Sequence, residues 1–180
     1  MTNRASAARY ARALMDVTRS EGGDLDGVER DLAAFVSLVD GEAALRRVLV
    51  TPALPAARKK ALVAGLLGRA SPGPQVSKLL LLLAERDRLA LLPDVLDHYR
   101  LRLLDLRNVV KAEVTTAVPL EAERIEALRA ALAAMTGRQV AMTTRVDPGL
   151  IGGVVTRIGS TVYDGSVKRQ LERMREALTQ

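Results

Sequence analysis

The period of the apolar residues changes once along the chain, near Asn108, and this change limits what the chain can fold into. Before it, apolar residues recur every three or four positions, the period of helices that bury one face. After it, apolar and polar residues alternate over 110–118, the period of a strand with one buried face. We therefore expect a helical domain over 1–107 and a second domain, containing a sheet, over 108–180.

Six helices are expected in the first domain, each with an apolar stripe and a breaker at its end. Glycine, or proline after the last residue, ends most of them. The connections are short, which is typical of an antiparallel bundle whose neighbours pack together. The expected ranges are 5–21, 25–39, 43–50, 55–68 (ended by Gly68), 76–85 and 92–107.

The fifth of these helices is apolar on almost every side between Val76 and Leu83. A helix of this kind is either surrounded by its neighbours or partly exposed to receive a partner. Packing in the centre of the bundle is the simpler of the two interpretations.

The second domain follows the order strand, helix, strand, strand, strand, helix, which predicts a small sheet with one face covered by the two helices. The fold class is therefore α+β: an N-terminal six-helix bundle followed by a small C-terminal domain with a short β-sheet and two helices. The expected elements are strand 110–118, helix 121–135, strands 140–146, 154–158 and 161–163, and a final helix with the apolar stripe Val167, Leu171, Met174 and Leu178.

Several small residues near the C-terminus predict turns and caps. Gly159 followed by Ser160 fits a two-residue type II′ hairpin turn. Asp164 or Ser166 is expected to cap the final helix. Gly152 and Gly153 indicate a bulge, a turn or a close approach of two backbones.

No feature of the sequence predicts catalysis. The chain has no cysteine and one histidine, His98, which excludes thiol nucleophiles and two-histidine metal motifs. It lacks the phosphate-binding motif Gly-x-x-x-x-Gly-Lys-[Ser/Thr], and its glycines do not match Gly-x-Gly-x-x-Gly. We expect no catalytic residue, no cofactor and no metal, and we do not expect an enzyme.

Charge raises one alternative partner. The net charge of +6 and the isoelectric point near 10.2 are compatible with a basic nucleic-acid-binding adaptor, whose binding would fall steeply with salt. Cations and anions are mixed, however, and the longest basic run, at 58–60, fits one solvated helical turn. Aromatic residues make up only 2% of the chain, so few side chains could stack on bases.

The C-terminal segment carries a family resemblance. Ile151-Gly152-Gly153, then five residues, Gly159, then four residues, Asp164-Gly165-Ser166 and a basic helix closely resemble the signature of the delta subunit of bacterial F-type ATP synthases. The mitochondrial relative is the oligomycin-sensitivity-conferring protein. Residues 8–14 and 82–93 are also similar to that family, which often has glycine where this chain has Asp87.

The resemblance implies a non-catalytic subunit of the peripheral stalk, present in a single copy. It would link the catalytic head to the membrane-anchored b subunits and resist rotational torque during ATP synthesis. It would lie on the cytoplasmic face of the cell membrane as a peripheral protein. No stretch is long and apolar enough to span a membrane, so we expect no direct insertion.

The resemblance also implies two sets of partner-binding residues. In the family, the N-terminal helix of an alpha subunit binds between the first and fifth helices, and the second domain meets the b subunits. For the leucines core packing, and for the cations ordinary surface charge, explain the pattern equally well. The implied alpha-binding residues are Tyr10, Ala13, Leu14, Val17, Val76, Leu79, Leu80 and Leu83, and the implied b-binding residues are Tyr163, Lys168, Arg169, Arg173 and Arg175.

Overall fold

The computed structural model describes residues 2–51, 54–159 and 161–178. The chain divides into two compact units, Met1–Leu103 and Leu104–Gln180. The division falls inside a helix, α6 (Leu92–Leu106), so a continuous helix leads from the first unit into the second. The change of apolar period at Asn108 therefore marks the start of the sheet, a little after the division itself.

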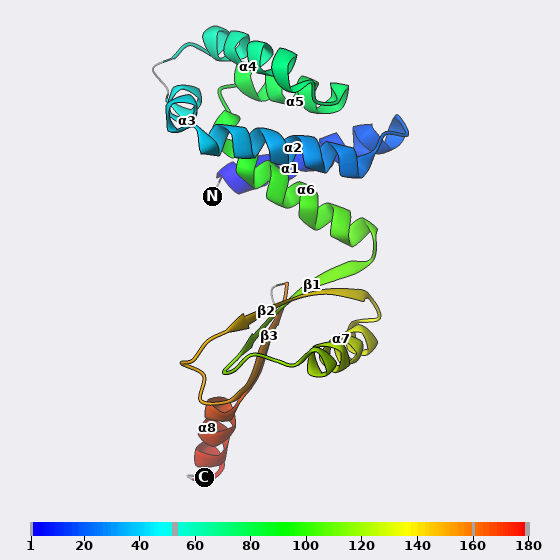
Figure 1. Cartoon of the computed structure of the whole chain (residues 1–180), viewed down its shortest axis with the longest axis vertical. Coiled ribbons are helices and arrows are strands. Elements are labelled where there is room, and N and C mark those ends of the chain that lie inside the picture. Colours follow the sequence, from blue (N-terminus) through cyan, green and yellow to red (C-terminus); the bar gives the residue numbers. More distant parts are fainter. Residues whose placement is uncertain (1, 52–53, 160, 179–180) are drawn as a thin grey trace. The chain divides into compact units, whose positions relative to one another are not determined.

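Helices make up the first unit, as the apolar periodicity predicts (Figure 1). A short 3-10 helix, η1, precedes α6 and was not predicted, because three residues are too few to show a period. Within the described residues the elements before α6 are α1 (Thr2–Ser20), α2 (Leu25–Gly41), α3 (Ala43–Val50), α4 (Ala56–Ala70), α5 (Pro74–Glu85) and η1 (Leu89–Leu91).

The prediction that Gly68 ends the fourth helix is wrong, because α4 continues through it to Ala70. A glycine inside a helix costs only about 1 kcal/mol, which packing elsewhere along the helix can offset. The helix ends where Ser71 adopts a left-handed backbone with φ of 45° and donates its N–H to the carbonyl of Leu67 at 2.8 Å. Proline at position 72 then prevents further helix.

The core of the first unit is built around α5, which packs against α1, α2 and α4. Five of its residues are buried, so central packing is the correct interpretation of this apolar helix. Burying one such leucine contributes about 2 kcal/mol. The buried residues of α5 are Val76, Leu79, Leu80, Leu83 and Ala84.

A buried tyrosine joins α6 to the start of α2. The Tyr99 ring is fully buried, and its hydroxyl donates to the carbonyl of Leu25 at 3.1 Å. Burial, followed by the negative charges of Asp26, Asp24 and Glu29, raises the pKa of Tyr99 to about 12. The hydroxyl therefore stays protonated as a donor throughout the physiological range.

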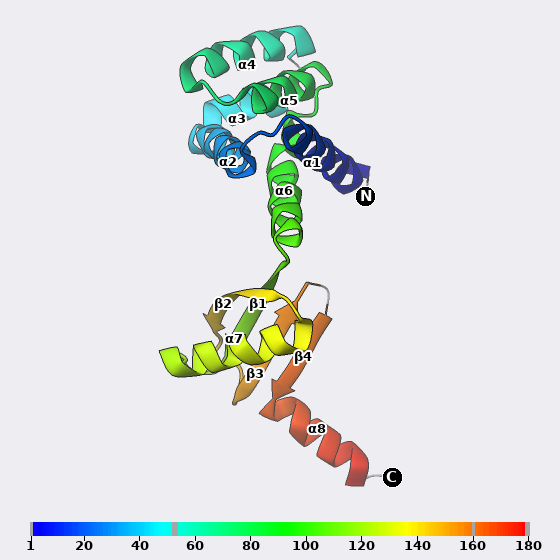
Figure 2. The same ribbon diagram turned by 90° about the vertical axis from the view of Figure 1, so that its right-hand side faces the viewer.

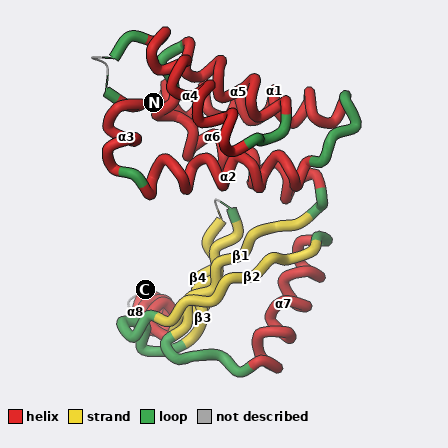
Figure 3. Tube along the Cα trace, turned by 45° about the horizontal axis from the view of Figure 1, so that its top comes forward, coloured by secondary structure: helices red, strands yellow, loops and turns green. Residues whose placement is uncertain are grey.

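The second unit contains a four-stranded sheet with the strand order β2-β1-β3-β4 (Figures 2 and 3). β1 and β2 are parallel because α7 crosses over between them, whereas the other two pairs are antiparallel. The elements are β1 (Val109–Thr116), α7 (Ala122–Thr136), β2 (Gln139–Val146), β3 (Gly153–Ile158), β4 (Thr161–Ser166) and α8 (Val167–Leu178).

The buried face of β1 is the one that the alternation predicts. Ala112, Val114 and Thr116 are buried, and Leu132 of α7 packs with Val140 of β2 in the same small core. Two strand ends differ from the expectation. β1 stops at Thr116, whose hydroxyl donates to the carbonyl of residue 118 at 2.8 Å, and β4 extends to the start of α8 rather than stopping at 163.

The prediction that both helices cover one face of the sheet is wrong for α8. Only α7 packs on the sheet core, whereas α8 contacts β4 and continues beyond the end of that strand (Figure 2). Its apolar stripe is exposed: Leu171 is 56% exposed and Met174 is 62% exposed. The stripe therefore lacks a partner surface within the described part of this unit.

Candidate functional site

The first candidate surface lies on α1 and α5, which are held together at both ends by side-chain hydrogen bonds. Gln75 donates to the carboxylate of Glu21 at 2.8 Å, near the C-terminal end of α1. Arg88, just after α5, donates to the hydroxyl of Tyr10 at 3.0 Å. These two contacts show that the helices run antiparallel and fix their register.

Most of the predicted alpha-binding residues lie in the core. Leu14, Val76, Leu79, Leu80 and Leu83 are all buried in the bundle. Core packing, the alternative interpretation for the leucines, therefore describes their positions in this structure.

Three of the predicted residues remain accessible on α1. Tyr10 is half-buried, Ala13 is exposed and Val17 is 44% exposed. Spacings of three and four place them on one face of the helix. Leu82, which is 41% exposed, lies seven positions after Gln75 and therefore shares the face of α5 from which Gln75 reaches Glu21.

We call the set Tyr10, Ala13, Val17 and Leu82 the α1–α5 surface. Sequence reasoning did not single out Leu82, because it lies within a run of leucines that look alike in the sequence. Only packing shows which member of the run faces outward. The small side chain of Ala13 lets another backbone approach closely at the middle of this surface.

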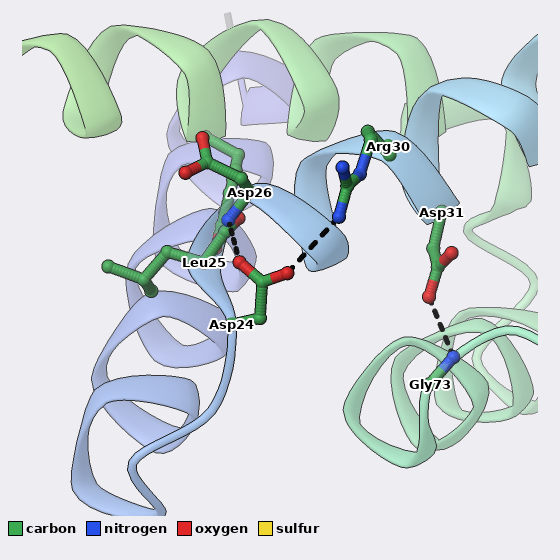
Figure 4. Close-up of polar contacts among 7 residues, drawn as sticks. Asp24, Leu25, Asp26, Arg30, Asp31 and Gly73 are labelled. Atoms are coloured by element: carbon green, nitrogen blue, oxygen red, sulfur yellow. Dashed lines mark hydrogen bonds and ion pairs between the residues drawn. The ribbon is translucent and has the colours of Figure 1, made fainter.

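Polar contacts fix the start of α5 relative to α2 (Figure 4). The carboxylate of Asp31 accepts the N–H of Gly73, the residue that caps α5, at 2.7 Å. Asp24 caps α2 by accepting the N–H of Asp26 at 3.0 Å, and it also accepts from Arg30 at 3.1 Å. The loop before α5 is therefore tied to a capped helix, which keeps the α1–α5 surface in place.

The second candidate surface is α8. Of the predicted b-binding residues, Lys168, Arg169, Arg173 and Arg175 are exposed along this helix, and Arg169 pairs with Glu172 at 3.3 Å. Tyr163, on the neighbouring strand β4, is 46% exposed. Beside these cations, α8 presents the apolar side chains of Val167, Leu171 and Met174, which we call the α8 stripe.

Glycines and a cap fix the first turn of α8 on the sheet. Gly153 has φ of 86°, and a Cβ atom there would lie 2.4 Å from the carbonyl oxygen of Gly165. The sequence allowed a bulge, a turn or a close approach of two backbones at Gly152 and Gly153. Close backbone approach is the correct interpretation at Gly153. The carbonyl of Gly152 accepts the N–H of Val167 at 3.0 Å, which joins the start of β3 to the start of α8.

Ser166 is the cap of α8, because its hydroxyl accepts the N–H of Arg169 at 3.2 Å. The carboxylate of Asp164 accepts the N–H of Ser166 at 2.9 Å and so holds this cap residue in place. Hydrogen bonds from Ser166, followed by the charges of Arg169 and Arg173, lower the pKa of Asp164. At the hairpin, Gly159 has the positive φ of 58° that the first turn position requires, while Ser160 lies outside the described residues, so the turn type stays a prediction.

A further hollow lies between α2, α3 and the η1–α6 segment. Phe35, Val39, Leu49 and Leu89 form most of its apolar lining. The ion pair of Arg46 with Asp40, at 3.8 Å, is its main polar feature. Its residues come from three separate segments, so no local pattern in the sequence could indicate it.

Metal-binding clusters and membrane-spanning helices are absent from the described residues. Within 2–51, 54–159 and 161–178 no group of three or more histidines or acids could hold a metal ion. In the same ranges none of the helices is long and apolar enough to cross a membrane. The candidate sites are exposed helix faces rather than a pocket with converging polar groups. The fold and its surfaces thus define a two-unit α+β protein with apolar side chains exposed on helices of both units.

Comparison with known proteins identifies the family. The family model described as ATP synthase delta (OSCP) subunit matches residues 7–178. ATP synthase subunit delta of Myxococcus xanthus is 41% identical over 184 residues, covering all of both chains. The same subunit of Citrifermentans bemidjiense is 39% identical over 178 residues, covering 99% of this chain and 98% of the relative. The chain belongs to the ATP synthase delta (OSCP) subunit family.

A solved structure supports the same conclusion over the full length. A chain in the cryo-EM structure of the Toxoplasma gondii mitochondrial ATP synthase hexamer is 25% identical, with a TM-score of 0.65 and coverage of 97% of both chains. This protein is a delta-type subunit of an F-type ATP synthase and a component of its peripheral stalk, as the resemblance implied. The comparisons give no support to the nucleic-acid-binding alternative.

Proposed function

We propose that this subunit joins the catalytic head to the membrane-anchored b subunits and thereby resists rotational torque during ATP synthesis. The first unit binds the N-terminal helix of an alpha subunit, and the second unit binds the b subunits. The observation that best supports this proposal is that both units expose apolar side chains on helices. These are Val17 on α1 and Leu82 on α5 in the first unit, and Leu171 and Met174 on α8 in the second. The subunit itself transforms no substrate.

The subunit occupies the complex in one copy, on the cytoplasmic face of the cell membrane. Its attachment is peripheral and runs through the b subunits. The absence of a membrane-spanning helix from the described residues supports this arrangement.

The α1–α5 surface suits a helical partner. Its apolar residues form a short stripe along the contact of two antiparallel helices, where an amphipathic helix can place side chains spaced by three, four and seven. Ala13 allows that helix to approach closely. Arg12 and Asp16, paired at 3.6 Å, border the stripe with charge and limit its apolar width.

Ala13→Arg tests this surface. The long charged side chain should block a docked helix, so binding of a synthetic peptide of the alpha-subunit N-terminus should weaken at least tenfold in titration calorimetry. Ala64→Arg, at an exposed position of α4, is the matched control and should bind as the wild type does. Because both positions are exposed, neither variant should lower the melting temperature much. Equal peptide affinity of Ala13→Arg and the wild type would exclude this surface.

Leu171→Ser tests the α8 stripe. Burying a leucine contributes about 2 kcal/mol, so its loss should weaken binding of the soluble part of the b subunits about thirtyfold. Gln170→Ser, on an exposed neighbouring position, is the control. If both variants bind the b subunits equally well, the stripe is not the contact.

A further inference from the structure

A buried lysine holds α4 on the bundle. α4 packs mainly against α5, and Lys59 and Val63 are its buried residues. The Lys59 side chain is fully buried, which is rare for lysine because an ammonium group without a partner is costly to remove from water. The interpretation of 58–60 as a solvated basic run is therefore wrong at Lys59.

The partner of Lys59 lies in the turn that follows α5. Its ammonium group donates to the carboxylate of Asp87, and the neighbouring Lys60 pairs with Glu85 at 2.9 Å. Two adjacent cations of α4 thus form ion pairs with two acidic residues at the C-terminal end of α5 and in the turn after it. The first pair is the important one, because Lys59 is buried whereas Lys60 and Glu85 are both about half exposed.

Asp87 adopts a backbone conformation that a side chain makes costly. Its φ is 53°, in the left-handed region where glycine would be free of strain. Aspartate is one of the few other residues that tolerate this region, and here its carboxylate is the partner of the buried ammonium group. Its N–H also donates to the carbonyl of Ala84 at 3.2 Å, which keeps the turn closed.

The next residue connects the same turn to α1. Arg88 donates from its guanidinium group to the hydroxyl of Tyr10 at 3.0 Å, and its backbone N–H donates to the carbonyl of Leu83 at 2.8 Å. Asp87 and Arg88 are adjacent, so one short turn contacts α4 through the first and α1 through the second. Tyr10 belongs to the α1–α5 surface.

We propose that the 86–88 turn is a clamp that joins α4 to α1, and that Lys59, Asp87 and Arg88 are positioning residues for the α1–α5 surface. They set the position of the Tyr10 ring, which forms one end of that surface, without contacting the partner themselves. This proposal rests on the proposed function of the α1–α5 surface as a site for an apolar helix.

A double-mutant cycle tests the link between Arg88 and Tyr10. Arg88→Gln and Tyr10→Phe each remove the hydrogen bond, and each should weaken binding of the alpha-subunit N-terminal peptide three- to tenfold in the full chain. The double variant should bind the peptide as tightly as the single variant with the lower affinity, because both substitutions remove the same contact. Arg86→Gln, an exposed arginine in the same turn, is the control and should bind as the wild type does.

The melting temperature separates positioning from general destabilisation. Arg88 is exposed, so Arg88→Gln should shift the melting temperature by no more than about 2 °C while peptide affinity falls. Wild-type affinity in both single variants, or fully additive losses in the double variant, would overturn the positioning role.

Hydrogen exchange tests the contact with α4 without any partner. Asp87→Asn keeps a residue that tolerates the left-handed backbone but leaves Lys59 without a carboxylate, so α4 amides should exchange at least tenfold faster. Adding Lys59→Met removes the buried charge and should restore slow exchange. Unchanged exchange in Asp87→Asn would overturn the clamp. If the wild type binds no peptide, the proposed function fails and the positioning role with it, whereas the exchange result still decides whether the turn holds α4.

Discussion

Replacing Gly153 with alanine should destabilise the second unit more than any other glycine-to-alanine change in its turns. Two separate costs apply at this position. The positive φ of 86° costs an alanine about 1–2 kcal/mol. The new Cβ would also lie 2.4 Å from the carbonyl oxygen of Gly165 and 2.8 Å from the Cα of Ser166, and both are backbone atoms that cannot rotate away.

Relieving that contact requires β3 and β4 to separate, which adds about 1–3 kcal/mol by analogy with overpacked cores. We therefore expect Gly153→Ala to lose about 2–5 kcal/mol of unfolding free energy in urea titrations followed by circular dichroism. Gly137→Ala is the matched control in the same unit. Gly137 has φ of 65° but nothing within 4 Å of a Cβ, so it carries only the first cost, about 1–2 kcal/mol.

A comparison of the two variants isolates the backbone contact. A loss in Gly153→Ala equal to that in Gly137→Ala would show that the close approach of β3 to the start of α8 imposes no constraint. The conclusion that Gly152 and Gly153 fix the first turn of α8 on the sheet would then be wrong.

Three further comparisons test how buried and exposed side chains contribute to stability. Asp87→Asn leaves a buried ammonium group unpaired and should cost about 2 kcal/mol of unfolding free energy. Lys59→Met leaves only a half-exposed carboxylate and should cost less than about 1 kcal/mol. Equal losses in urea titrations of the two variants would contradict this difference. Leu80→Ala, in the core, should cost about 3 kcal/mol, and Leu82→Ala, on the α1–α5 surface, less than about 1 kcal/mol in the same assay. The folded-state pKa of Asp164 is lowered from its ordinary 3.8, so its stabilising contribution is present above about pH 4 and is lost as the pH falls through the lowered pKa. Asp164→Asn should therefore melt below the wild type at pH 7, with the difference disappearing in the acid range; a constant difference at all pH values would contradict the assignment.

The sequence was sufficient to predict most of the helices and strands, because each has a period that one buried face imposes. The alternation in β1 also predicts which face is buried, and Ala112 and Val114 lie there. Periodicity does not say what covers a face, however. The α8 stripe has the same spacing as a core-facing stripe, and only the three-dimensional structure shows that the sheet ends before Leu171 and Met174 can pack on it.

The contacts within the first unit were harder to predict for a related reason. Lys59 looks like its neighbours in a basic run, and Leu82 looks like its neighbours in a leucine run. Which member faces inward depends on the rotation of α4 and α5 about their axes, and packing with other helices sets that rotation. The pairing of Lys59 with Asp87 joins α4 to the turn after α5, 28 residues further along the chain, so no local spacing could indicate it.

The two candidate surfaces differ in how firmly the fold supports them. The α1–α5 surface is fixed at both ends by Gln75 with Glu21 and by Arg88 with Tyr10, so it is formed before any partner arrives. At its first turn, α8 is fixed to the sheet by the Ser166 cap and the Gly152 carbonyl.

A helix of this length is marginal in water unless tertiary contacts support it. A partner that buries Leu171 and Met174 gains about 2 kcal/mol from each, and part of that gain is used to order the later turns of α8. Binding at α8 is therefore coupled to the stability of the helix itself. The α1–α5 surface, in contrast, offers a partner a preformed site with little ordering left to do.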